Sequence, residues 1–276
     1  MRRSIQLALV AVLAVGAIAV AAAPGKLLLV ICSPGSPGST EEAQPRIDAF
    51  ARALSAKAGT TITAVYEPTE AGGVKQLGGA AVGVVSLPFF LVHEKDLGMH
   101  ARLVAVQEGR PALESWVLVA QKGRIHKAEE LAGFTIASSA AFAPGFVRAA
   151  TAGLGALPAN VKLQEMTAVL SSLRRAAAGE PIAVLLDGPQ AGALKSLAFA
   201  DKLDVVTRSP AWPAGIVVSL DARMPAKAWA PIQTALTGLA ADRAAAQTLA
   251  AIQIAKFVAL DEKSLASARQ AYGRKP

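Results

Sequence analysis

Five serine hydroxyls follow short, continuous apolar segments of the chain. Such segments are typical of strands that are buried on both faces of a sheet. Ligands of open α/β sheets lie beyond the carboxyl ends of the strands, so the positions after these segments are candidate binding positions. Hydroxyl groups, together with free amides at a helix start, hold the oxygen atoms of small anions. The candidates are Ser33 and Ser36 after 27–31, Ser86 after 81–85, and Ser138 and Ser139 after 134–137.

Several of these serines also have a purely structural interpretation. Ser33 and Ser36 belong to the stretch Ser-Pro-Gly-Ser-Pro-Gly, which is equally typical of a plain turn. The neighbouring Ser39, with Glu42 three residues later, predicts a capping box at the start of a helix. Ser86 stands shortly before a proline and could cap a helix instead of facing a ligand.

Two carboxylates occupy positions from which they could face a ligand. Asp187 ends the apolar segment 182–186 and precedes Gly188, so its alternative role is that of a turn-forming aspartate. Glu114 lies in a turn-rich stretch. A carboxylate in a cleft repels an anion unless it is protonated or paired, and it suits an amine-bearing ligand better. A surface carboxylate is the simpler interpretation of Glu114.

The sequence lacks the residue patterns of common catalytic and metal sites. It contains no Gly-x-Ser-x-Gly elbow, no phosphate-binding P-loop and no His/Glu pair at metal-ligand spacing. The single cysteine, Cys32, follows five apolar residues, which predicts a buried thiol rather than a nucleophile. The sequence therefore favours a binding protein over an enzyme, and it predicts neither a cofactor nor a metal site.

Composition excludes further classes of protein. The 276 residues are 53% hydrophobic and 17% charged, which excludes a disordered or low-complexity chain. Aromatic residues make up 5%, too few to predict stacking platforms for single-stranded nucleic acid. The formal net charge of +8 comes without a run of basic residues. It favours a small anion or an anionic membrane surface and does not predict nucleic-acid binding.

The first residues have the pattern of a secretory signal peptide. Two arginines follow Met1, residues 7–20 are almost all apolar, and alanines occupy positions 19 and 21. We predict a signal peptide over residues 1–21 and an exported protein. The alternative is an uncleaved membrane anchor, because the apolar stretch is nearly long enough to span a bilayer.

Strand and helix patterns alternate along the rest of the chain. Residues 27–85 predict strand, helix, strand, helix, strand, which indicates a mostly parallel sheet with helices on both faces. A second alternating block covers 115–186. Turn-rich sequence near 108–114 and a return near 205–211 indicate two crossings between two lobes, which would form a hinge. We predict a bilobal α/β fold with lobe 1 over 22–110, lobe 2 over 111–205, and a return to lobe 1 with C-terminal helices over 206–276.

The alanine-rich C-terminal part carries apolar residues at helical spacing. One set is Trp229, Ile232, Leu236 and Leu239, and the other is Leu249, Ile252 and Phe257. We expect both sets to lie on helices.

Three local patterns together resemble type 2 periplasmic solute-binding proteins. The stretch 126–137 (HKAEELAGFTIA) resembles the helix–strand unit at the entry to the second lobe of that family. Residues 169–187 resemble the family's helix, Gly-Glu, strand and acidic residue, and 81–88 resembles the first-lobe strand that ends on a ligand-facing loop. The nearest branch is formed by the phosphate, phosphite and phosphonate binders of ABC importers. The resemblance covers most of residues 26–276.

This resemblance implies a protein of the periplasm that closes two lobes on a small ligand and delivers it to an ABC transporter permease. The branch indicates that this ligand is an oxyanion. Many family members place ligand contacts at the crossing, which adds Ser115 to the candidates. Binders of this branch usually carry a Ser-Thr-Ser-Gly-like loop after the second-lobe strand, whereas here Ser138 and Ser139 are followed by Ala140 and Ala141. An alternative function is that of a ligand sensor or interaction protein of the envelope without a transport role.

Overall fold

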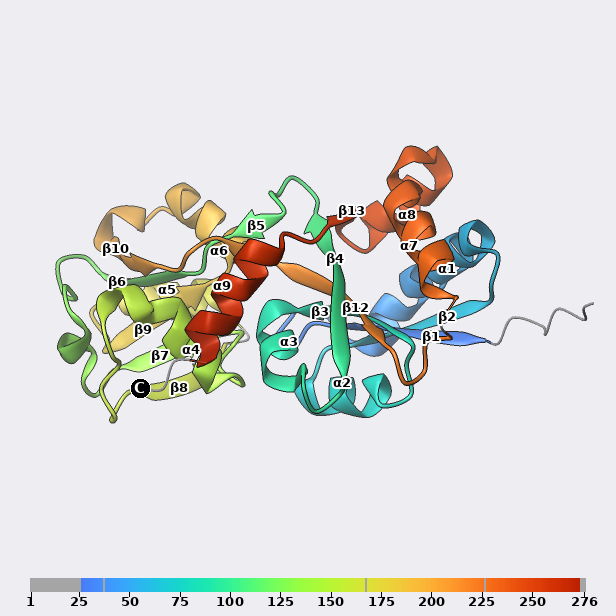
Figure 1. Cartoon of the computed structure of the whole chain (residues 1–276). Helices are drawn as coiled ribbons and strands as arrows, with labels where there is room; N and C mark the ends of the chain where they lie inside the picture. Colours follow the sequence, from blue (N-terminus) through green and yellow to red (C-terminus); the bar gives the residue numbers. More distant parts are fainter. Residues whose placement is uncertain (1–25, 37, 167, 226, 274–276) are drawn as a thin grey trace, which may run out of the picture.

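The computed structural model describes residues 26–36, 38–166, 168–225 and 227–273, and it contains two separate large sheets. The predicted signal peptide over 1–21 lies outside these residues. Within them, no helix is both long and apolar enough to cross a bilayer. Figure 1 shows the two sheets at the two ends of an elongated molecule, with the last helix between them. We call the part built on each sheet a lobe.

The first lobe is built on a six-stranded sheet of order β13-β4-β12-β3-β1-β2. The parallel pairing of β1 with β2 and β3 agrees with the predicted parallel sheet, while β12 and β13 add antiparallel pairs. Its strands are β1 (Leu27–Cys32), β2 (Ile62–Glu67), β3 (Val82–Ser86), β4 (Met99–Gln107), β12 (Gly215–Leu220) and β13 (Ile254–Ala259). Its helices are α1 (Thr40–Ala58), α2 (Glu70–Leu77), α3 (Leu87–His93), α7 (Trp229–Gly238) and α8 (Arg243–Ala251).

Helices cover both faces of this sheet, which explains the apolar strands. Leu29 and Val30 are neighbours on β1, point to opposite faces and are both fully buried. Leu29 packs in a core with α1, α7 and α8, whereas Val30 packs in a core with α2 and α3. The predicted capping box of Ser39 and Glu42 is present at the start of α1, and Gly59 ends that helix in the left-handed conformation.

The second lobe is built on a five-stranded sheet of order β10-β6-β9-β7-β8. Helix α4 packs on one face of the sheet, and α5 on the other. The strands are β6 (Val117–Gln121), β7 (Thr135–Ser138), β8 (Lys162–Glu165), β9 (Ile182–Leu186) and β10 (Leu203–Arg208). The helices are α4 (Pro144–Thr151), α5 (Val169–Ala177) and α6 (Gly188–Ala193).

The chain crosses between the lobes twice, and the two crossings pair with each other. Strand β5 (Leu113–Glu114) forms an antiparallel pair with β11 (Trp212–Pro213). The last helix, α9 (Glu262–Gly273), follows a first-lobe strand and packs against α4 of the second lobe and against β11. Two short strands and one helix therefore connect the lobes.

The predicted helical position of Phe257 is wrong, because this residue lies on strand β13. Helix α8 ends at Ala251, and Gln253 follows in the left-handed conformation with φ of 60°. The pairing of β13 with β4 is irregular between Ile254 and Lys256. A bulge lets residues three apart face the same side of a sheet. Ile254 and Phe257 are both buried in this way, which imitates a helical spacing.

The segment after Ser86 forms helix α3, which agrees with the helix-cap interpretation of Ser86 and differs from the ligand-facing loop that the resemblance implies. Pro88 suits the first turn of a helix, where its missing amide has no partner to lose. Five residues of α3, 87–91, are buried against the core.

Three aromatic rings join the crossings to the second lobe. Phe146 of α4 lies 4.9 Å from the ring of Trp116 and 5.9 Å from that of Trp212, between ring centroids. Phe146 and Trp212 are fully buried. The same apolar core continues into Phe89 and Phe90 of α3 in the first lobe and Leu265 of α9. The lobes therefore share one core at the crossings.

The variant Phe146→Ala tests this shared core. We expect it to lower the free energy of unfolding by about 3–5 kcal/mol, because it removes a ring from a packed site and leaves a cavity. Leu170→Ala, at a side chain that is 43% exposed, is the matched control and should change it by no more than about 0.5 kcal/mol. Urea denaturation of both variants measures the difference. Similar losses in the two variants would contradict the shared core.

Candidate functional site

A cavity of about 260 Å³ opens at the carboxyl ends of β1 and β3. Three of the predicted serines, Ser33, Ser36 and Ser86, line it. The other walls come from α1, from the end of β4 and from the segment before β13. All the described residues that line it belong to the first lobe. This is the place in the sheet at which we expected a ligand.

Ser33 and Ser36 form a hydroxyl pair at one side of the cavity. Their Oγ atoms lie 2.8 Å apart, and the amide of Ser36 donates to the carbonyl oxygen of Ser33 over 3.1 Å. The loop is therefore a turn, as the structural interpretation predicts, and its hydroxyls still line the cavity. The contact of these hydroxyls with a ligand stays a prediction.

Ser86 has a buried hydroxyl that lacks a partner. Its Oγ atom makes no hydrogen bond with any described residue. Ser86 occupies the cap position of α3, but its side chain makes no capping bond. Burial of a hydroxyl without a hydrogen bond costs about 1–3 kcal/mol, so such a group is normally satisfied by a ligand or by water. Ser86 lines the cavity, but its Oγ atom is itself buried away from solvent.

Ser138 and Ser139 differ sharply in their surroundings. The Ser138 hydroxyl is fully buried, donates to the carbonyl of Leu185 over 3.0 Å, and accepts from the amide of Ala140 over 3.1 Å. Its hydrogen bonds are thus made within the second lobe. Ser139 is half-buried and lies against Gly35 of the first-lobe loop. A Cβ atom on Gly35 would stand 2.8 Å from the carbonyl oxygen of Ser139. The two predicted loops therefore touch across the lobes.

Asp187 and Ser115 lie away from the first cavity. Asp187 caps α6, where its Oδ1 accepts from the amide of Gln190 over 2.8 Å, so the structure gives it the local turn role. Ser115 lines a second cavity of about 300 Å³ at the crossings, together with Glu114 and Arg110. Of the seven predicted site residues, the structure thus brings three together at one cavity and a fourth, Ser139, to its loop.

Glu114 is half-buried beside a second carboxylate. Its Oε2 atom lies so close to Gly188 that a Cβ there would be 2.2 Å away. Burial raises the pKa of Glu114 to about 7, and the carboxylate of Asp187 adds to the rise, while the Gly188 amide and Arg110 oppose it. Burial also raises the pKa of Asp187. Arg110 donates to the carbonyl of Pro189 over 3.3 Å, and Arg208 lines the same cavity.

Sequence reasoning missed several polar residues of the first cavity, among them Tyr66, Arg46 and Gln253. Tyr66 lies near the end of β2, beside β1, so the rule that points to Ser33 could have found it. Burial raises the pKa of Tyr66, which keeps it a hydroxyl. Arg46 lies on α1, and Gln253 carries the left-handed backbone noted above. No pattern in the sequence marks these two.

The remaining reactive side chains have structural partners. Cys32 is fully buried, and burial together with the carboxylates of Glu67 and Glu70 raises its pKa to about 12. His93 lies 2.9 Å from Glu70 between Nε2 and Oε1. Among the described residues no three His, Cys, Asp or Glu side chains gather as a metal site would need.

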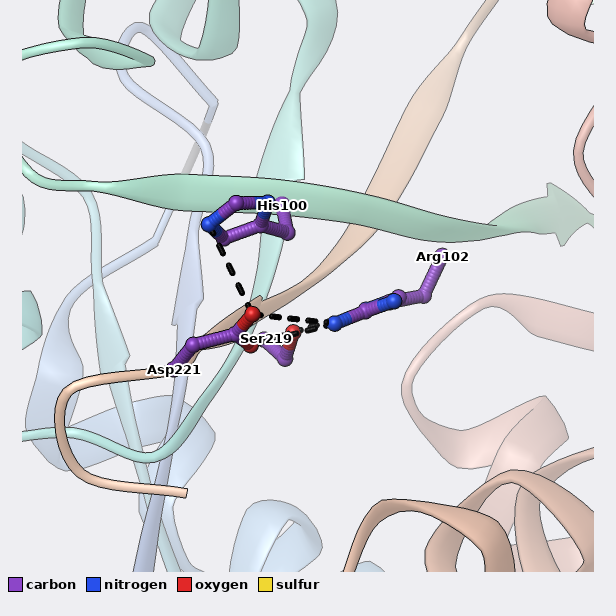
Figure 2. Close-up of polar contacts among 4 residues, drawn as sticks. All are labelled: His100, Arg102, Ser219 and Asp221. Atoms are coloured by element: carbon purple, nitrogen blue, oxygen red, sulfur yellow. Dashed lines mark hydrogen bonds and ion pairs between the residues drawn. The ribbon is translucent and has the colours of Figure 1, made fainter. Parts of the chain in front are cut away.

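A polar cluster occupies the opposite end of the first sheet. Arg102 of β4 donates through Nε to Ser219 of β12 over 2.8 Å, and its Nη2 lies 3.1 Å from Asp221 (Figure 2). His100 approaches the same carboxylate at 3.5 Å. The hydrogen bond from Ser219 and the guanidinium of Arg102 hold the pKa of Asp221 below its ordinary value. The cluster ties two paired strands together on the surface and is not part of the cavity.

The contact between Gly35 and Ser139 predicts an effect of Gly35→Ala. The new methyl group would collide with the Ser139 backbone, and the φ of 77° adds the cost of a left-handed alanine, about 1–2 kcal/mol. Gly98→Ala is the matched control, because Gly98 has a φ of 61° and nothing within 4 Å of the added atom. We expect Gly35→Ala to be less stable than the control and to have a larger radius of gyration. Identical behaviour of the two variants in urea denaturation and X-ray scattering would contradict the contact.

The pKa of Glu114 predicts a dependence of stability on pH. Its ordinary value is 4.5, so the folded protein holds this proton more strongly than the unfolded chain does. Stability should therefore fall as pH rises from about 4.5 to about 7, by up to about 3 kcal/mol at about 1.4 kcal/mol per unit of pKa. Glu114→Gln should remove most of this fall. Urea denaturation across this pH range tests it, with the exposed Glu108→Gln as the control; an unchanged slope in Glu114→Gln would contradict the prediction.

Comparison with known proteins identifies a family that this chain matches. The family model described as "ABC transporter, phosphonate, periplasmic substrate-binding protein" matches residues 36–265. No curated protein sequence matches the chain significantly.

Three solved structures share the fold at low sequence identity. XAC2383 from Xanthomonas citri bound to chloride ion has a TM-score of 0.68 at 15% identity, covering 89% of this chain and 97% of its own. A binding protein component of an ABC phosphonate transporter from Pseudomonas aeruginosa has a TM-score of 0.61 at 15% identity, covering 89% and 85%. PhnD1 from Prochlorococcus marinus in complex with methylphosphonate has a TM-score of 0.61 at 11% identity, covering 88% and 96%.

These likenesses confirm the predicted bilobal fold of type 2 periplasmic binding proteins. The family match extends over most of the described chain and includes the second sheet and every strand of the first sheet except β1. This protein therefore belongs to the family of periplasmic substrate-binding proteins of phosphonate ABC transporters, and its role is to bind a solute.

Proposed function

We propose that this protein captures a small oxyanion of the phosphate or phosphonate type between its lobes and hands it to the permease of an ABC importer. The observation that carries the proposal is the cavity at the ends of β1 and β3, with the Ser33–Ser36 hydroxyl pair in its wall. These groups donate hydrogen bonds without bringing negative charge, as an anion requires.

The charges around the cavity support an anionic ligand. No carboxylate is found among the described residues that line it, and Arg46 contributes a cation. The relative PhnD1 was solved with methylphosphonate, so a phosphonate occupies a protein of this fold. Glu114, which would repel an anion, lies in the other cavity.

The place of Ser139 suggests how the lobes take part. Its loop touches the loop of Ser33 and Ser36, so a ligand at the first-lobe hydroxyls would lie near the second lobe as well. A ligand that contacts both lobes favours the state in which they meet. Ser138 would hold the loop of Ser139 in place and would not contact the ligand, because its own hydroxyl already has two partners in the second lobe.

Export and the lobe boundaries complete the proposal. A signal peptide over 1–21 would direct the chain to the periplasm, which is where the family acts. Lobe 1 would comprise 22–110 and 206–276, and lobe 2 would comprise 111–205, with α9 reaching across to α4. The protein would work as a carrier and not as an enzyme.

Thermal unfolding with added anions tests the proposed ligand class. At a hundred times its dissociation constant a ligand adds about 2.7 kcal/mol of stability, which raises the melting temperature by about 5–10 °C in a protein of this size. We expect such a rise with phosphate, phosphite or methylphosphonate, and none with potassium chloride at equal ionic strength. A cooperative unfolding curve that no phosphorus oxyanion shifts would contradict the proposal.

A further inference from the structure

The last helix, α9, contacts both lobes and the crossing between them. It runs between the two sheets in Figure 1. Leu265 and Ala268, three residues apart on one face of the helix, are fully buried in the shared core. The indole nitrogen of Trp212, on β11, donates to the hydroxyl of Ser267 over 3.4 Å. The middle of α9 is therefore held at the crossing.

Arg269 joins α9 to α3 of the first lobe. Its guanidinium donates from two nitrogens to the carboxylate of Glu94, which caps the end of α3, and Nε lies 3.0 Å from Oε2. The Cζ atom lies 5.4 Å from the centre of the Phe90 ring. A two-pronged pair of this kind fixes orientation as well as distance. Because the side chain of Arg269 is 39% exposed, salt can screen the pair and weaken it.

Tyr272 joins the same helix to α4 of the second lobe. A Cβ atom on Gly145 would stand 2.8 Å from Cε2 of the Tyr272 ring, so the ring lies directly on the first turn of α4. Residues three apart are neighbours on the surface of a helix. The contacts of Arg269 and Tyr272 with opposite lobes are therefore linked through less than one turn of α9.

The two helices that α9 joins both begin beside candidate binding loops. Helix α3 starts directly after Ser86, and α4 starts shortly after Ser139. The two helices also contact each other. A rotation of one lobe against the other moves α3 relative to α4, so it must open the contact of α9 with at least one of them.

We propose that α9 is a strap that fixes the position of the two lobes relative to each other, with Arg269 and Tyr272 as its positioning residues. The pair with Glu94 is the contact that opens, because it is ionic and partly exposed, whereas Leu265 and Ala268 stay in the core. This inference goes beyond the proposed function, because it concerns how the lobes are held and does not depend on the ligand.

The distance between spin labels on the two lobes measures their relative position. The full chain with Arg52→Cys on α1 and Lys195→Cys after α6 carries one label on each lobe, at exposed positions far from α9 in sequence. The native Cys32 is fully buried, and burial raises the pKa of its thiol to about 12, so it does not take up label.

We expect Arg269→Ala to widen the distribution of this distance. The fraction of molecules outside the main distance should rise by about twofold to fivefold, the range that a partly exposed ion pair can supply. Tyr272→Ala should widen the distribution as well, because it opens the contact with the other lobe. Arg175→Ala is the matched control, since it removes an ion pair with Glu180 that lies within the second lobe, and it should leave the distribution unchanged.

Salt and charge reversal separate the strap from a simple loss of packing. In about 1 M salt, where the Debye length is about 3 Å, the distribution of the unaltered protein should widen, and that of Arg269→Ala should not change further. Reversal of the pair, Arg269→Glu with Glu94→Arg, should restore most of the narrow distribution. Unchanged distributions in both Arg269→Ala and Tyr272→Ala, or an equal effect of salt on the unaltered protein and Arg269→Ala, would overturn the inference.

Discussion

The shared apolar core at the crossings is the constraint on which the rest of the structure depends. Phe146 packs between Trp116 and Trp212, and the cluster continues to α3 of the first lobe. Rings packed in this way hold the ends of both sheets at a defined distance. Loops follow those strand ends, and Gly35 of one loop lies against Ser139 of the other. Aromatic packing thus sets the geometry that the polar groups use.

Given that frame, the hydrogen bonds of each polar group decide whether it is available to a ligand. Ser138 and Ser86 both follow buried strands, yet Ser138 has two partners and Ser86 has none among the described residues. The difference arises from neighbours far away in sequence, since one partner of the Ser138 hydroxyl is the carbonyl oxygen of Leu185. A buried hydroxyl that is already satisfied gains little from a ligand, whereas an unsatisfied one gains a full bond.

This contrast marks how far the sequence could predict the site. The strand ends, the capping box at Ser39 and the two crossings follow from local patterns, and the structure contains them. Strand β13 escaped prediction because a bulge puts Ile254 and Phe257 on one face at a helical spacing. The different hydrogen bonding of Ser138 and Ser86 could not be predicted from the sequence either, because it depends on tertiary contacts. Local sequence patterns predict which polar groups lie at strand ends, and tertiary packing determines which of them lack a hydrogen-bond partner.

The carboxylates and the serine hydroxyl pair lie at different cavities. Glu114 and Asp187 lie at the crossings, where burial raises the pKa of both and Arg110 offsets part of the repulsion. The first cavity has no carboxylate among its described lining residues. A carboxylate pair can be tolerated beside a hinge because partial protonation relieves it, but beside a bound oxyanion it would oppose the ligand directly. The fold keeps its acidic pair at the connection between the lobes and its hydroxyls at the strand ends, which is the arrangement that an anion carrier requires.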